Sequence, residues 1–139
     1  MEIPAAVRKA IEACPIAHVV TLNPSGTAQI TMAWIGLEGD EIVIGTMFDQ
    51  RKLDNIRRDE RIAISFETGR TGTSGLPGYI VMHGRAWLAD GGAPAVLQRL
   101  ARGYVGPDVV FPGPNAPEGW VIHIAVDRIS GSDVAVAHD

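Results

Sequence analysis

Two adjacent cations, Arg51 and Lys52, fall in the first turn of a short predicted helix, where together they could bind an anion. A helix N-terminus carries partial positive charge, so cations there are unfavourable unless a bound anion reverses the penalty. Backbone N–H groups, the hydroxyl of Thr46 and the two cations would then converge on that anion. Asp49 is a plausible N-cap for the same helix.

The apolar residues around these cations predict the order strand, helix, strand. Residues 41–44 (Glu-Ile-Val-Ile) are typical of a short buried strand, and residues 62–66 alternate large and small side chains like another strand. Leu53 and Ile56 lie between them at helical spacing. We therefore expect the cations at the start of a helix that connects two strands.

The same charges have a simpler interpretation. Asp54 and Arg58 are four residues apart and could form an ion pair on a solvated helix face. Arg51 and Lys52 would then be exposed side chains that contribute little to folding. The spacing of the charges alone does not decide between an anion site and a solvated face.

A wider set of motifs resembles the pyridoxamine 5′-phosphate oxidase-like family of flavin- and deazaflavin-binding split β-barrels. The likeness covers about residues 3–132, and its strongest part resembles the family's phosphate-binding segment. The residues that carry it are Thr46-x-x-x-x-Arg51-Lys52, Asn55-Ile56-Arg57-Arg58-Asp59-x-Arg61, the stretch 19–26 (Val-Val-Thr-Leu-Asn-Pro-Ser-Gly) and the stretch 79–86 (Tyr-Ile-Val-Met-His-Gly-Arg-Ala).

The resemblance implies a mostly β fold, a six-stranded antiparallel split β-barrel with short peripheral helices. We expect residues 1–139 to form one such domain. It further implies a homodimer that holds its cofactor in a groove at the dimer interface, with the second wall of the groove supplied by the partner chain.

The resemblance also implies the cofactor-binding residues, which come from four parts of the chain: Gln29 and Thr31; Thr46; Gln50, Arg51 and Lys52; and Tyr79. Gln29 and Thr31 could instead be the solvent face of a strand. Tyr79 could instead have only a structural role, as a residue of high β-propensity at the start of a strand. No catalytic side chain can be assigned, because a bound cofactor would supply the reactive centre.

The short chain is more similar to family members that use coenzyme F-420, a deazaflavin, so we favour this cofactor over FMN. One departure points the other way. Deazaflavin-using members commonly have arginine where this chain has Gln50 and lysine two residues on, whereas Gln50-Arg51-Lys52 is closer to the FMN oxidases. The expected reaction is hydride transfer between the cofactor ring and a small organic substrate. The alternative is a non-catalytic protein that carries a cofactor or haem.

The remaining chain predicts further strands and helices. In the second strand we expect Ile30, Met32 and Trp34 to share one face, with Met32 and Trp34 in the core or in an interface. In the loop 106–118, four prolines stiffen the chain and Phe111 is the expected anchor. The predicted elements are a helix over 4–13, strands over 16–22, 27–37, 78–89 and 120–131, a helix over 94–104, a loop over 67–77 and a frayed tail over 132–139.

Composition excludes several classes of function. The net charge of −4 argues against a nucleic-acid partner, and no apolar run reaches the roughly 18 residues needed to span a membrane. The single Cys14 suits a reducing cytoplasm, where we expect a buried structural thiol. The four histidines are scattered, so no metal site is expected.

Overall fold

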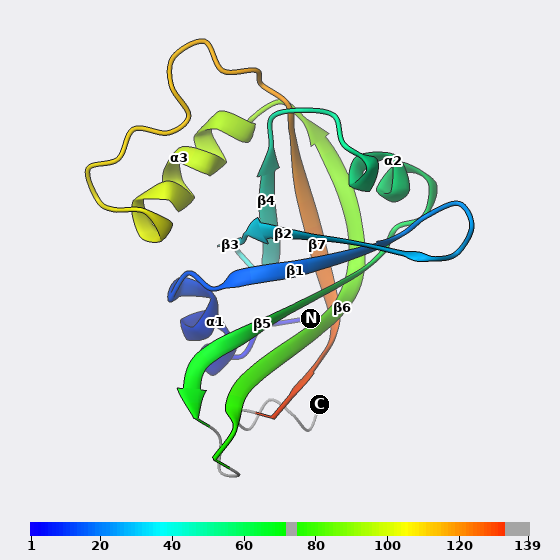
Figure 1. Ribbon diagram of the computed structural model, residues 1–139, viewed down its shortest axis with the longest axis vertical. Coiled ribbons are helices and arrows are strands. Elements are labelled where there is room, and N and C mark those ends of the chain that lie inside the picture. Colours follow the sequence, from blue (N-terminus) through cyan, green and yellow to red (C-terminus); the bar gives the residue numbers. More distant parts are fainter. Residues whose placement is uncertain (72–74, 133–139) are drawn as a thin grey trace.

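The computed structural model describes residues 1–71 and 75–132 as a curled antiparallel sheet with three helices (Figure 1). The expected tail beyond residue 132 and the middle of the expected loop 67–77 lie outside the described residues. The helices are α1 (Ala5–Glu12), α2 (Arg51–Arg58) and α3 (Ala93–Tyr104). The strands are β1 (Ile16–Leu22), β2 (Ala28–Trp34), β3 (Gly36–Glu38), β4 (Glu41–Thr46), β5 (Arg61–Thr71), β6 (Pro77–Asp90) and β7 (Trp120–Gly131).

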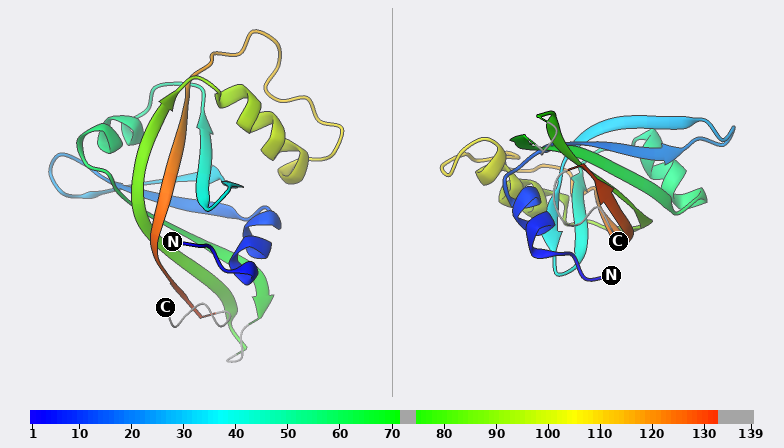
Figure 2. Two further views of the ribbon diagram at one scale, coloured as in Figure 1. Left: turned by 180° about the vertical axis from the view of Figure 1, so that it is seen from behind. Right: turned by 90° about the horizontal axis from the view of Figure 1, so that it is seen from below.

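The sheet has the order β2-β1-β5-β6-β7-β4-β3, so its two edge strands, β2 and β3, are neighbours in the chain. β1 and β2 run across the direction of β4 and β7, and α2 and α3 lie on opposite sides of the upper end (Figures 1 and 2). This curled but unclosed sheet is the predicted split barrel. None of the helices in the described ranges is long and apolar enough to cross a membrane.

The sheet contains seven strands rather than the predicted six, because the expected strand over 27–37 divides at Ile35. Ile35 is buried, and its N–H donates to the Tyr104 hydroxyl at 3.0 Å instead of to a strand. On the far side of this corner, Gly36 pairs with Val43 of β4. A β-carbon at Gly36 would lie 2.5 Å from a terminal methyl carbon of Leu100, so α3 packs closely on this corner.

In β6 the alternating residues Ile80, Met82 and Ala86 are buried in the core. α1 buries Val7 and Ile11, which lie four residues apart on one face of the helix. β5 is longer than expected, because strand pairing continues beyond residue 66 to Thr71 through an irregularity after Glu67.

Two of the alternatives for β2 are wrong: Met32 does not lie in the core, and Gln29 and Thr31 do not form a solvent face. Ile30 and Met32 are 60% and 59% exposed, whereas Gln29 and Thr31 are half-buried. Gln29 and Thr31 pair with Thr21 and Val19, whose side chains face the interior of the curl. Alternation shows which residues share a face, but only the surrounding strands decide which face points inward.

Trp34, expected in the core or in an interface, and Cys14, expected to be buried, both lie at the margin of the core. Trp34 is half-buried, with its ring stacked on Tyr104 at a centroid distance of 5.1 Å. Cys14 is also only half-buried, and it adopts a left-handed conformation with φ of 61°. Partial burial raises the pKa of the Cys14 thiol and so favours its protonated form.

Candidate functional site

A cavity of about 300 Å³ lies at the split of the barrel, where β2 and β4 approach each other but do not pair. Its wall includes residues from both strands, from the start of α2 and from the segment after α3. Those used below are Met32, Trp34, Thr46, Gln50, Lys52 and Phe111. We call this cavity the split pocket.

Lys52 is the most informative residue of the split pocket, because its side chain is buried and unpaired. It is only 6% exposed, and no hydrogen bond or ion pair to it occurs within residues 1–71 and 75–132. Burial lowers the pKa of the Lys52 ammonium. The expectation of an exposed lysine is therefore wrong. A partly desolvated ammonium without a partner is unfavourable, and a bound anion would offset that cost.

Two buried hydroxyl groups are also unpaired. The Oγ1 atoms of Thr46 and Thr31 have no hydrogen-bond partner in the part of the chain that the structure describes. Thr46 ends β4 and lines the split pocket together with Lys52. Buried polar atoms in folded proteins are nearly always hydrogen-bonded, so an unpaired hydroxyl beside a cavity indicates a missing ligand or water.

The N-terminus of α2 is left without a side-chain cap. Gln50 occupies the N-cap position in extended conformation and makes no capping bond with its side chain. The prediction of Asp49 as N-cap is wrong, because its carboxylate instead lies 3.3 Å from Arg57. The same guanidinium lies 2.8 Å from Asp54, so the expected Asp54–Arg58 pair is replaced by Asp54–Arg57. The first N–H groups of the helix thus remain available to an anion.

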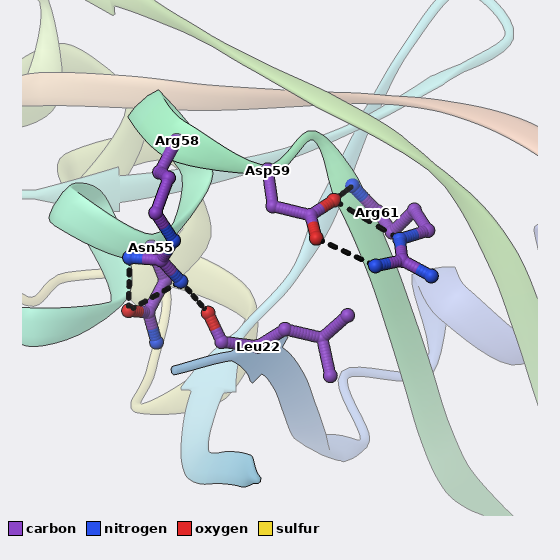
Figure 3. Close-up of polar contacts among 5 residues, drawn as sticks. All are labelled: Leu22, Asn55, Arg58, Asp59 and Arg61. Carbon is purple, nitrogen blue, oxygen red and sulfur yellow. Dashed lines mark hydrogen bonds and ion pairs between the residues drawn. The ribbon is translucent and has the colours of Figure 1, made fainter. Parts of the chain in front are cut away.

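The second half of α2 is fixed to β1 by polar contacts (Figure 3). Asn55, which is buried, donates to the Thr21 hydroxyl at 3.0 Å and to Asn23 Oδ1 at 3.1 Å. Arg58 donates to the Leu22 carbonyl. Together these contacts set the direction of the helix, so that its uncapped N-terminus faces the split pocket.

An ion pair between Asp59 and Arg61 closes the turn from α2 into β5. Asp59 accepts from the Arg61 side chain at 2.7 Å and from its backbone N–H at 3.1 Å (Figure 3). These bonds, the side-chain bond first, lower the pKa of Asp59 to about 2. These bonds stabilise the ionised form of the carboxylate more in the folded chain than in the unfolded chain.

We therefore expect Asp59 to contribute to acid stability in a defined pH window. Because the folded pKa lies below the ordinary value of about 3.9, its contribution is present above about pH 4 and is lost as pH falls towards 2. In urea titrations at several pH values, the difference in unfolding free energy between wild type and Asp59→Asn should shrink across this window. Asp108→Asn, which removes an exposed carboxylate, is the control; a difference that does not change with pH would contradict the prediction.

The structure brings together only some of the residues predicted to bind a cofactor. Thr46, Gln50 and Lys52 line the split pocket. Arg51 is exposed in the same helical turn, and Gln29 and Thr31 lie on the inward face of β2. Tyr79 lies apart, 46% exposed at the opposite end of β6 from the strand's contact with Trp120. Within a single chain, Tyr79 therefore does not lie beside the other predicted cofactor-binding residues.

The opposite wall of the split pocket is aromatic. Phe111, the expected anchor of the proline-rich loop, lies edge-on to Trp34 at a centroid distance of 5.7 Å. Met32 and Phe48 also line the pocket, and both are largely exposed at its rim. Sequence reasoning missed Phe48, because an isolated aromatic residue in a turn carries no periodic signal. The pocket thus has one cationic end and one apolar, aromatic end.

A second hollow of about 570 Å³ lies beside the other face of α2, where Arg57 sits over the Trp120 ring at 5.5 Å. Its cations are already paired: Arg57 with Asp49 and Asp54, and Arg58 with the Leu22 carbonyl. No group of three potential metal-binding side chains occurs within the described ranges. The split pocket is therefore the better candidate for an anionic ligand.

Comparison with known proteins gives one family match and several similar structures. A family profile described as pyridoxamine 5′-phosphate oxidase matches residues 3–131. A structure named F-420 reductase superposes with a TM-score of 0.75 at 19% identity, over 92% of this chain and 98% of that chain. A conserved hypothetical protein from Mycobacterium tuberculosis gives 0.74 at 20% identity, over 96% and 86%. HupZ from Group A Streptococcus gives 0.66 at 22% identity, over 96% and 99%. Comparison with curated protein sequences gives no match.

Proposed function

The chain belongs to the pyridoxamine 5′-phosphate oxidase family, and from this premise we propose that its split pocket binds the phosphate end of a flavin-type cofactor. The observation that supports this most directly is the unpaired Lys52, 6% exposed, in the wall of the same pocket as the buried, unpaired hydroxyl of Thr46. A phosphate would pair with the ammonium and accept a hydrogen bond from the hydroxyl. The residues present therefore fit the group that the family implies.

Each part of the pocket would have a separate task. Lys52, Thr46 and the first N–H groups of α2 would hold the phosphate, with Gln50 and Arg51 at the rim. The free edge of β2, the strand that carries Gln29 and Thr31, would lie along the ring, since it pairs with no described strand. Trp34 and Phe111 would exclude water from the apolar end.

The proposed activity is that of an oxidoreductase. When bound, the cofactor would supply a ring that exchanges hydride with a small organic substrate. The chain would contribute orientation and electrostatic stabilisation, because Lys52 is the one ionisable side chain in the wall of the split pocket as described. No protein nucleophile enters this proposal.

We favour coenzyme F-420 as the cofactor and keep FMN as the alternative. The chain spans nearly the whole length of the structure named F-420 reductase, which supports the deazaflavin. The order Gln50-Arg51-Lys52 supports FMN, because it places the two cations next to each other in the helix.

Spectroscopy and titration of the purified protein test the proposal. A yellow protein with a flavin spectrum supports FMN, whereas a colourless protein that binds added F-420 supports the deazaflavin. A Soret band would indicate the non-catalytic haem carrier instead. A protein that binds none of the three ligands contradicts the proposal. Hydride transfer from the bound reduced cofactor to a panel of small unsaturated compounds then tests for enzymatic activity.

We also propose that two copies of the chain associate through the outer face of the sheet. Ile16, Ile30, Met32 and Tyr79 share this face and are 47%, 60%, 59% and 46% exposed. A set of large apolar side chains on one exposed face favours an isologous interface between copies. Tyr79 would then contact the partner chain, which would explain why it lies far from the split pocket of its own chain.

Dimerisation and cofactor binding should therefore be linked. A cofactor that contacts both chains tightens the dimer by the same factor by which the dimer tightens the cofactor. Sedimentation at several protein concentrations, with and without FMN or F-420, measures this factor. A monomer that binds the cofactor with full affinity would rule out a shared site.

A further inference from the structure

The segment between α3 and β7, residues 105–119, carries Phe111 to the mouth of the split pocket (Figure 1). The two ends of this segment are fixed by backbone hydrogen bonds. Val105 and Gly106 donate to the Ala101 carbonyl at one end, and the Glu118 and Gly119 carbonyls accept from Ala93 and Gly91 at the other. The middle of the segment therefore depends on other contacts.

A single side chain, Gln98 of α3, makes those contacts. Its Nε2 donates to the Val109 carbonyl at 3.0 Å, and its Oε1 accepts from the Phe111 N–H at 3.0 Å. Within the described ranges, the other backbone hydrogen bond of residues 107–117, from the Val109 N–H to the Gly106 carbonyl at 3.2 Å, stays inside the segment and does not tie it to α3 or to the sheet. A primary amide carries a donor and an acceptor on one rigid group, so it can hold a carbonyl and an N–H two residues apart.

The orientation of this amide is determined by its partners. If the oxygen and nitrogen of Gln98 exchanged places, its NH₂ group would face the Phe111 N–H and its oxygen would face the Val109 carbonyl. The bond to the Val109 carbonyl is partly buried, so water would not fully replace it.

The other side of the aromatic wall is fixed independently of Gln98. Trp34 stacks on Tyr104, whose hydroxyl donates to the Pro15 carbonyl at 2.5 Å and accepts from the Ile35 N–H at 3.0 Å. Trp34 is thus bound to the body of the fold, whereas Phe111 is held opposite it through the Gln98 amide. The two rings meet at the apolar end of the pocket.

We propose that Gln98 is a positioning residue that holds Phe111 over the split pocket and thereby strengthens retention of the bound ligand. This inference rests on the proposed function for one point, the identity of the ligand as a flavin-type cofactor. Gln98 itself does not line the pocket, so its effect would be exerted through the backbone of Val109 and Phe111.

A double-mutant cycle tests this coupling. Titration with FMN and with F-420 should show binding to Gln98→Leu weakened about fivefold, as expected when hydrogen bonds worth about 1 kcal/mol are lost. Phe111→Ala should weaken binding by at least as much, and Gln98→Leu should add little to it in the double variant. Arg102→Ala, which removes an exposed residue of the same helix, is the control. Two results would overturn the proposal. One is wild-type affinity in Gln98→Leu. The other is a double variant in which the separate losses of affinity of the two substitutions multiply in full.

A measurement without ligand separates this proposal from the proposed function. Amide hydrogen exchange at Phe111, followed by NMR, should accelerate at least about fivefold in Gln98→Leu and stay unchanged in Arg102→Ala, because only the former loses the acceptor. If neither cofactor binds the wild type while Phe111 exchange responds as expected, the proposed function fails and the positioning contact stands. Unchanged exchange at Phe111 in Gln98→Leu overturns the positioning role, whichever ligand binds.

Discussion

Replacing Lys52 with methionine is expected to weaken the binding of FMN or F-420 by about 1.5–3 kcal/mol, or roughly ten- to a hundredfold. The reason is that Lys52 is only 6% exposed and lines the split pocket without a partner in the described chain, so a phosphate would be the main source of stabilisation for its ammonium. Methionine keeps most of the buried volume and removes the charge. Isothermal titration of wild type and variant measures the difference.

The stability of the ligand-free protein should respond in the opposite direction. Desolvation of an ammonium without a partner costs free energy, so Lys52→Met should be at least as stable as wild type in urea. Arg51→Ala is the matched control, because Arg51 is the adjacent cation but is exposed; its effect on affinity should be smaller. Unchanged affinity for both ligands would remove Lys52 from the site. Marked loss of ligand-free stability would show that the lysine stem is needed for packing.

The residue types around α2 predicted the helix and its position between two strands. They could not predict which charges would pair. Three carboxylates and three arginines lie within a few residues of one another, and only the folded backbone places Arg57 within reach of both Asp49 and Asp54. The prediction that Asp49 caps the helix was wrong for this reason. Its carboxylate, which could have capped the helix, instead pairs with an arginine two turns away.

Long-range geometry explains the other errors. The period of β2 correctly grouped Gln29 with Thr31 and Ile30 with Met32, but β2 is an edge strand whose inward face depends on β1 and β4. Likewise, the sequence marks Tyr79 as a family position without showing at which end of the sheet it lies. The burial of Lys52 could not be read from its residue type, because lysine is mostly exposed unless it is paired.

Substituting Gly119 with alanine is expected to destabilise the fold by about 2–4 kcal/mol. Gly119 lies immediately before β7 with φ of 55°, a conformation that favours glycine. A β-carbon there would collide with the Thr46 carbonyl oxygen and would lie 2.7 Å from the Met47 Cα, and neither backbone atom can move aside as a side chain can. The expected loss therefore combines backbone strain with overpacking, and thermal or urea unfolding measures it.

Gly26→Ala separates these two contributions. Gly26 also has a positive φ, 88°, but an added β-carbon there meets nothing within 4 Å, so only the strain of about 1 kcal/mol should remain. The collision at Gly119 acts on Thr46 and Met47, the residues that lead from β4 into the split pocket. Gly119→Ala should therefore also weaken binding of FMN or F-420, whereas Gly26→Ala should not. Equal losses of stability in the two variants would mean that the backbone at Thr46 yields to the added methyl group, and the predicted coupling between this glycine and the anion site would be wrong.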